Sequence, residues 1–158
     1  MLLLNDYEQY SRRNNLCIHG IQPDSECRLL AVNFIKSVLK VPRIEEKEIA
    51  HSAYGPQSTY GNDQTSTAQP ARRPVILVRF YQHDHRDMVI RAQNILKGTR
   101  YAVTEDLTSL NVKTMNRLKN SDMVRKTWSW NGMIFAILSN DKKVVVHPFQ
   151  SIHDLMND

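Results

Sequence analysis

The sequence predicts an α+β protein, in which a β-α-β-β-α-β unit precedes a small α/β C-terminal domain with a β-hairpin. Short apolar runs of strand-like pattern lie between stretches whose apolar residues recur at helical spacing. The dipeptide Asn131-Gly132, between two apolar runs, is a strong signal for a hairpin turn. A chain of 158 residues suits one domain or two small ones. We expect the end of a coiled coil over residues 1–11, a first domain over 12–108 and the C-terminal domain over 109–158.

The first ten residues have the spacing of a coiled-coil seam. Leu3, Tyr7 and Tyr10 are four and then three residues apart. Fewer than two heptads are too few to stand alone, so the pattern predicts the end of a longer coiled coil.

The first domain is predicted from strand patterns and helical stretches in alternation. Gly20 ends the first strand, and Ser25 or Asp24 can cap the first helix. Lys97-Gly98 gives the second helix a basic last turn and a glycine stop. The predicted strands are Leu16–Ile21, Ile44–Tyr54, Val75–Phe80 and Tyr101–Val103, and the predicted helices are Glu26–Lys40 and Asp84–Leu96. This order is that of a ferredoxin-like, split βαβ arrangement.

The remaining segments are a loop and the C-terminal domain. Residues 55–71 are rich in Ser, Thr, Gln, Gly, Asn and Pro and show no periodicity, which predicts a mobile loop. The C-terminal domain is predicted to contain helices Leu110–Lys126 and Ser151–Met156 and strands Lys126–Trp130, Met133–Leu138 and Lys143–His147.

Composition excludes several classes of protein. The chain has no apolar run of 18 residues, so we expect no membrane-spanning helix, and its first residues lack the pattern of a signal peptide. Cys17 and Cys27 lack zinc spacing and are expected to be reduced thiols of a cytoplasmic or nuclear protein.

Positive charge is concentrated in one third of the chain. The net charge is +5, but residues 71–126 hold 12 Lys and Arg against 5 Asp and Glu. This concentration favours a phosphate-binding face, and the alternative is an ordinary solvated basic helix.

A four-stranded unit with basic charge suggests an RNA-recognition motif, which stacks bases on aromatic side chains of its central strands. Side-chain alternation places Ile76, Val78 and Phe80 toward the helices in our prediction. The stacking positions are then Cys17, Val75 and Leu77, none of which is aromatic. Phosphate contacts, with Arg79 on the open face, would therefore carry most of the affinity.

Five segments occur in an order that carries a family resemblance: Tyr10–Ile21, Arg73–Phe80, Ala92–Thr99, Glu105–Thr108 and Trp130–Phe135. Together they resemble the first open-reading-frame protein of LINE-type retrotransposons, over nearly the whole chain. The family implies a trimeric coiled coil, a noncanonical RNA-recognition motif and a C-terminal domain. The last two jointly bind single-stranded RNA or DNA, and the protein acts as a nucleic-acid chaperone in cytoplasmic ribonucleoprotein particles, with a nuclear location as the alternative.

The resemblance and the charge pattern give a set of candidate nucleic-acid-binding residues. The set is Arg12, Arg13, Arg72, Arg73, Arg79, Arg91, Lys97, Arg100, Arg117, Lys119, Arg125 and Lys126. Two departures from the family stand out: Ser52 replaces the usual basic residue after Ala50-His51, and the loop is long and nearly uncharged. The coiled coil beyond residue 10 is missing, which leaves homotrimerisation of this chain open.

Several alternatives stay open. Arg12 and Arg13 can also form a solvated turn, and Arg117, Lys119, Arg125 and Lys126 do not form one narrow helical stripe. Trp128 and Trp130 point to the same face of one strand, either as base-stacking side chains or, the favoured interpretation, as core.

No arrangement of residues predicts an enzyme, a cofactor or a metal site. His83-Asp84-His85 has ligand residue types, but neighbouring helical positions point apart. We expect a non-enzymatic nucleic-acid-binding module. The alternative is a protein-interaction module of a domesticated host protein, whose partner would bind the open sheet face at Val75 and Leu77.

Overall fold

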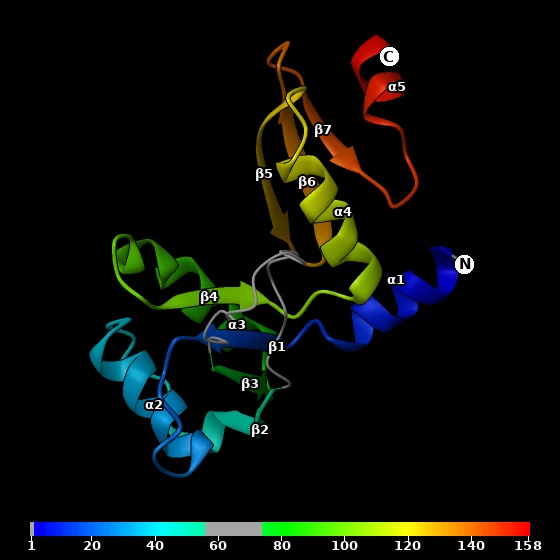
Figure 1. Cartoon of the computed structure of the whole chain (residues 1–158). Helices are drawn as coiled ribbons and strands as arrows, with labels where there is room; N and C mark the ends of the chain where they lie inside the picture. Colours follow the sequence, from blue (N-terminus) through cyan, green and yellow to red (C-terminus); the bar gives the residue numbers. More distant parts are fainter. Residues whose placement is uncertain (1, 56–73) are drawn as a thin grey trace, which may run out of the picture. The chain divides into compact units, whose positions relative to one another are not determined.

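The structure, a computed structural model, describes residues 2–55 and 74–158 (Figure 1). These residues form two compact units by their contacts. The first unit is Asn14–Thr104, and the second unit combines the chain up to Arg13 with Glu105–Asp158. The predicted domains, 1–11, 12–108 and 109–158, separate the N-terminal helix from the C-terminal residues, whereas this division groups them. Most of the predicted loop 55–71, with Arg72 and Arg73, lies outside the described residues.

The first unit follows the predicted β-α-β-β-α-β order, with two short 3-10 helices added. Its elements are β1 (Asn15–His19), α2 (Cys27–Ser37), η1 (Glu46–Glu48), β2 (Ile49–Tyr54), β3 (Val75–Phe80), α3 (His83–Arg91), η2 (Ala92–Leu96) and β4 (Ala102–Glu105), whose last residue belongs to the second unit. The strands form one sheet in the order β2-β3-β1-β4, and β3 pairs antiparallel with both neighbours.

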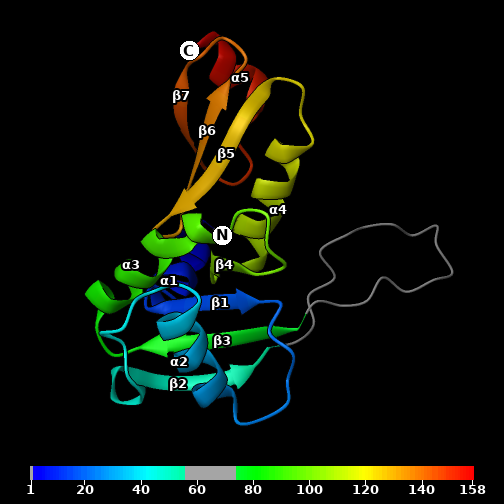
Figure 2. The same ribbon diagram turned by 90° about the vertical axis from the view of Figure 1, so that its left-hand side faces the viewer.

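Both helices of the first unit pack on its sheet. Helix α2 contacts β2 and β3, and α3 contacts β1 and β3 (Figure 2). Alternation along β3 buries Ile76, Val78 and Phe80 under these helices, as predicted, each with 1% or less of its surface exposed. Leu16 and Ile18 of β1 are fully buried. The apolar core therefore lies on the helix side and leaves the opposite sheet face to other side chains.

Several predicted boundaries of the first unit are wrong. Helix α2 is capped by Glu26, whose carboxylate accepts the amides of Arg28 and Leu29 at 3.2 Å, so neither Ser25 nor Asp24 is the cap. Its helical hydrogen bonds stop before Lys40, which has φ of 60°. The helix predicted over Asp84–Leu96 divides into α3 and η2, because the Ala92 amide donates to the Val89 carbonyl and tightens the turn. The strand predicted over Ile44–Tyr54 begins at Ile49, after η1.

The second unit contains a three-stranded antiparallel sheet. Its elements are α1 (Leu2–Ser11), α4 (Ser109–Lys119), β5 (Val124–Trp130), β6 (Met133–Leu138), β7 (Lys143–Val146) and α5 (Ile152–Asn157). The sheet order is β5-β6-β7. The hairpin is confirmed, since Asn131 and Gly132 both have positive φ, 50° and 77°, as a two-residue turn of this kind requires.

The helix predicted over Leu110–Lys126 is too long by seven residues. Helix α4 ends at Lys119, where the Ser121 amide donates to the Leu118 carbonyl in a closing turn. Residues from Val124 onward form β5 instead. The polar turn after Lys119 is the signal for this end, because Asn, Ser and Asp favour turns over helix interiors.

One face of the second sheet carries the core of its unit. Leu118 of α4, Ile134, Ala136 and Leu138 of β6 and Val146 of β7 are each exposed by 2% or less. Met115 of α4 and Leu155 of α5 pack against this cluster. The chain is thus a mixed α/β protein with two antiparallel sheets and five α-helices among its described residues. No helix of residues 2–55 and 74–158 has the length and apolar character needed to span a membrane.

Candidate nucleic-acid interface

Arg79 lies on the open face of the first sheet, at the position the alternation predicts. Its side chain is exposed, and its Nε donates to Oδ1 of the buried Asn15 at 3.0 Å. Asn15 is the direct partner of Arg79 across the β1–β3 pair, and the exposed His51 is its partner on β2. A guanidinium anchored through Nε keeps its two terminal nitrogens for a further acceptor. This geometry suits a phosphate or carboxylate at the sheet surface.

The rest of this open face is less accessible than predicted. Cys17 and Leu77 lie opposite each other and are half-buried. The alternation along β3 places Val75 on the open face, yet only 8% of its surface is exposed. The amide of Gly55, just after β2, donates to the Val75 carbonyl at 2.9 Å, which places this strand end beside Val75. The predicted stacking positions are therefore neither aromatic nor fully open.

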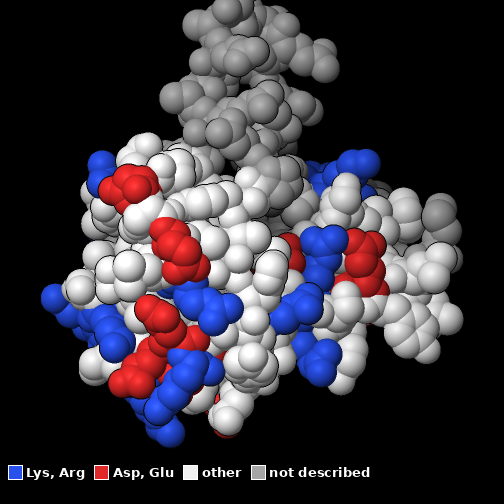
Figure 3. Space-filling model, turned by 90° about the horizontal axis from the view of Figure 1, so that it is seen from below, with Lys and Arg blue, Asp and Glu red and all other residues white. Residues whose placement is uncertain are grey.

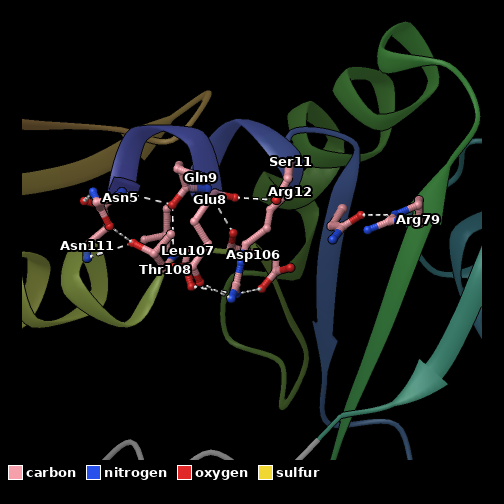
Figure 4. A network of polar contacts seen from close by, with 11 residues as sticks. Asn5, Glu8, Gln9, Ser11, Arg12, Arg79, Asp106, Leu107, Thr108 and Asn111 are labelled. Atoms are coloured by element: carbon pink, nitrogen blue, oxygen red, sulfur yellow. Dashed lines mark hydrogen bonds and ion pairs between the residues drawn. The ribbon is translucent and has the colours of Figure 1, made fainter. Parts of the chain in front are cut away.

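Arg12 is engaged by two carboxylates of its own unit. Its guanidinium lies 2.6 Å from Glu8 and 3.0 Å from Asp106, and it also donates to the Leu107 carbonyl (Figure 4). A guanidinium with two carboxylate partners has little charge left to offer a phosphate. Arg13 is exposed, donates to the Tyr10 carbonyl and lies 4.2 Å from the centre of the Tyr10 ring.

A buried polar network joins α1 to the start of α4, and it was not predicted. Asn5 Nδ2 donates to Asn111 Oδ1 at 3.2 Å, and Thr108 Oγ1 donates to Asn5 Oδ1 at 2.6 Å (Figure 4). Gln9 Oε1 accepts the Thr108 amide and Asn111 Nδ2, both at 2.9 Å. Asn5 and Gln9 are four residues apart and thus share one helix face, a spacing that indicates a polar face on this helix but not its partner.

The predicted seam residues of α1 lie on the exposed side of the helix. Leu3 and Tyr7 are 66% exposed and Tyr10 is 64% exposed. The coiled-coil interpretation of these residues stays a prediction.

Three candidate cations near the end of the first unit have exposed side chains. Arg91 lies in the last turn of α3, and Lys97 follows η2. Arg100 donates to the Tyr101 hydroxyl at 2.8 Å and lies over that ring, so it has a local partner.

The basic third of the sequence is not a uniformly basic surface. Arg86 of α3 is 1% exposed and pairs with Asp87 at 2.8 Å, so its charge is buried and cannot contact a polyanion. Arg125 forms an ion pair with Asp141. On the face drawn in Figure 3, acidic side chains lie among the basic ones. Counting charges along the sequence therefore overestimates the cations that a polyanion can reach.

The sheet of the second unit separates its candidate cations. Arg117 and Lys119 are exposed in the last turn of α4, where they also complement the helix dipole. Helix α4 packs on the core face of the sheet, through Leu118. The hydroxyl of Thr127 contacts Met115 of α4, so Thr127 lies on the core face of the sheet. Neighbouring residues of a strand point to opposite faces, so Lys126 lies on the other face. Arg117 and Lys126 thus do not share one direct phosphate path.

The outer face of the second sheet, opposite α4, carries an aromatic pair with lysines. The rings of Trp128 and Phe135, cross-strand partners, are stacked with centroids 5.6 Å apart and planes within 10°. Lys126 Nζ lies 5.7 Å from the Trp128 ring, and Lys143 Nζ lies 5.4 Å from Trp128 and 5.6 Å from Phe135. We call these four residues the aromatic–lysine face.

The favoured interpretation of the tryptophans as core residues is wrong. Trp128 and Trp130 are half-buried and do not belong to the buried cluster of the second unit. Their shared face is confirmed by the strand register, since Trp128 pairs with Phe135 and Trp130 with Met133. Their strand alternation alone was not enough to choose the face, because the core could have lain on either side.

The described residues offer no arrangement for metal binding. Over residues 2–55 and 74–158, no three His, Cys, Asp or Glu side chains are placed to hold one ion. His83 is used locally, since it bonds the Asn14 side chain at 3.1 Å and lies 3.4 Å from Asp87.

Comparison with known proteins does not extend the family resemblance. No protein-family model matches the sequence, and no curated protein matches it significantly. The likeness to the first open-reading-frame protein of LINE-type retrotransposons stays a prediction from the order of the five segments.

Proposed function

We propose that this protein is a non-enzymatic module that binds single-stranded nucleic acid, with nucleic-acid chaperone activity and little sequence preference. In this proposal the first unit is an atypical RNA-recognition motif that contacts phosphates rather than stacking bases. The observation that carries it is Arg79, an exposed cation on the open face of the first sheet, anchored by Asn15. The family resemblance gives independent support.

The anchoring of Arg79 explains why it suits a phosphate. Nε is held by Asn15 Oδ1 at 3.0 Å, so the side chain loses less conformational freedom when its terminal nitrogens bind a ligand. A planar guanidinium matches two phosphate oxygens, whereas lysine would offer a single point charge. Contacts of this kind position a strand and carry no sequence information.

A gel-shift titration with single- and double-stranded oligonucleotides at two salt concentrations tests the proposal. Affinity for the single strand should fall with salt, with a log–log slope of about −0.7 for each phosphate neutralised. Arg79→Ala should weaken binding to all sequences by up to about fivefold, as expected for an exposed charge pair. It should also remove about 0.7 from the slope.

Two further variants sharpen this test. Arg79→Lys keeps the charge but loses the planar contact, so it should fall between wild type and Arg79→Ala. Arg43→Ala removes another exposed cation of the same unit and should leave the affinity unchanged. A salt-independent affinity, or no binding at low salt, would refute the proposal.

The alternative, a protein-interaction module, has less support than the sequence suggested. Val75 is 8% exposed, so the apolar part of the open face shrinks to the half-buried Leu77 and Cys17. A protein partner that is lost in Leu77→Asp and kept in Arg79→Ala would favour this alternative.

A further inference from the structure

We infer that the aromatic–lysine face of the second unit binds an unpaired base of single-stranded nucleic acid by stacking, with its lysines on the flanking phosphates. This inference rests on the proposed function and adds a base-binding site to the phosphate contact at Arg79. The site consists of Trp128, Phe135, Lys126 and Lys143. It lies within one unit, on one sheet.

The stacked rings form a flat apolar surface in a place where the fold does not need one. The core of the second unit is on the other face of the sheet, around Leu118 and Ile134. Trp128 and Phe135 are half-buried and nearly parallel, which is the arrangement of an offset stack. Trp128 belongs to β5, an edge strand of the sheet, so a planar ligand can extend the stack beyond its ring.

The lysines select a ligand that is both aromatic and anionic. Lys143 Nζ is almost equally distant from the two rings, and Lys126 Nζ is near Trp128. An apolar peptide on this face would bury two ammonium groups without anionic partners, which is unfavourable. A nucleotide supplies a base for the rings and phosphates for the ammonium groups. Lysine side chains are flexible enough to move from a ring to a phosphate without displacing the ring.

Single-stranded nucleic acid fits this face better than a duplex does. Bases of a duplex are already stacked and paired, so reaching the Trp128 ring would require breaking those contacts first. An unpaired base has both ring faces available, and stacking on an aromatic side chain tolerates any base. The site is therefore compatible with binding that has little sequence preference.

Tryptophan fluorescence provides the first test, without altering Trp128. The chain has two tryptophans, so Trp130→Phe leaves Trp128 as the reporter. The probes are an oligothymidylate of roughly 10 nucleotides, a length typical of single-strand sites, and an abasic oligonucleotide of the same length. We expect the base-bearing probe to quench Trp128 and the abasic probe to leave it largely unchanged at equal saturation.

Affinity measurements on variants provide the second test. Trp128→Leu should weaken binding of the oligothymidylate by about five- to 150-fold and leave abasic binding nearly unchanged. Trp128→Phe should recover most of the loss, because it restores a ring. Lys126→Gln and Lys143→Gln should each reduce the salt slope by about 0.7. Tyr7→Leu, an aromatic-to-leucine change at an exposed position of α1, is the matched control and should have no effect.

The outcomes separate this inference from the proposed function. If wild type binds both probes equally and Trp128→Leu binds like wild type, the base site is refuted and the phosphate module stands. If wild type binds neither probe at low salt, both proposals are refuted. A Trp128 signal that changes with protein concentration in the absence of a probe would instead identify this face as a contact between copies. Thermal unfolding of Trp128→Leu and Trp128→Phe shows whether either substitution acts through the fold.

Discussion

Replacing Thr108 with valine should destabilise the second unit, because Thr108 connects α1 to α4 through a buried network. Its side chain is 1% exposed. Its Oγ1 accepts the Asn111 amide at 3.2 Å, as the N-cap of α4, and donates to Asn5 Oδ1 at 2.6 Å. Valine has nearly the same shape but makes neither hydrogen bond.

The expected magnitude is the sum of two separate losses. Loss of an N-cap side chain costs about 1 kcal/mol. Asn5 is 7% exposed, so its Oδ1 would lose the hydroxyl donor inside the protein, which costs about 1–3 kcal/mol. We therefore expect the free energy of unfolding of the second unit to fall by roughly 2–4 kcal/mol.

Urea unfolding followed by tryptophan fluorescence measures this loss in the right part of the chain. Both tryptophans, Trp128 and Trp130, belong to the second unit, so their signal reports its unfolding rather than that of the first. Thr108→Ser is the control, since it keeps the hydroxyl and removes a methyl group worth about 0.8 kcal/mol. If the valine and serine variants unfold at the same urea concentration with the same slope, the network does not stabilise the unit and the reasoning is refuted.

Two further predictions concern the first unit. Gly20→Ala should lower its stability by about 1–3 kcal/mol, because Gly20 has φ of 100° and an added Cβ would lie 2.6 Å from the Arg100 carbonyl oxygen; an unchanged thermal midpoint by circular dichroism would contradict this. The pKa of Tyr54 is raised from 10.0, first by desolvation and then by electrostatic interaction with Cys27, Asp24 and Glu26. The folded state thus holds this proton more tightly than the unfolded chain, and the stabilisation is present below pH 10.0 and lost as pH rises through the raised pKa. The difference in stability between wild type and Tyr54→Phe should therefore shrink in alkaline solution, and a difference independent of pH would count against it.

Regular periodicity made most elements predictable from the sequence, while their ends depended on local hydrogen bonds. The alternation of β3 correctly placed Ile76, Val78 and Phe80 against the helices. The start of α2 was misjudged because Glu26 caps it with both carboxylate oxygens, a role more typical of Ser or Asp. The end of α4 was misjudged because the polar turn after Lys119, which ends the helix, was included in it.

The residues of the candidate site could be predicted where their position follows from the alternation of side chains along a strand. They could not be predicted where their position depends on tertiary contacts. The alternation of side chains along β3 placed Arg79 on the open face. The same alternation along β5 grouped Trp128 with Trp130, but the side on which the core lies follows from the packing of α4, which no local pattern contains. The engagement of Arg12 by Asp106 joins residues 94 positions apart, a separation that spacing rules do not reach.

In the proposed function, the two sheets divide the requirements of single-strand binding between them. The open face of the first sheet presents a guanidinium but no aromatic ring at Cys17, Val75 or Leu77, so it suits a phosphate and is indifferent to the base. The outer face of the second sheet presents the Trp128–Phe135 stack, which in our inference distinguishes a strand with bases from one without. The proposed chaperone activity requires holding strands without fixing their sequence, and sequence-tolerant stacking together with salt-sensitive phosphate contacts would meet that requirement. Variants of Arg79 and Trp128 should consequently differ in kind: the first changes the salt dependence for every probe, and the second changes the preference for bases over abasic sites.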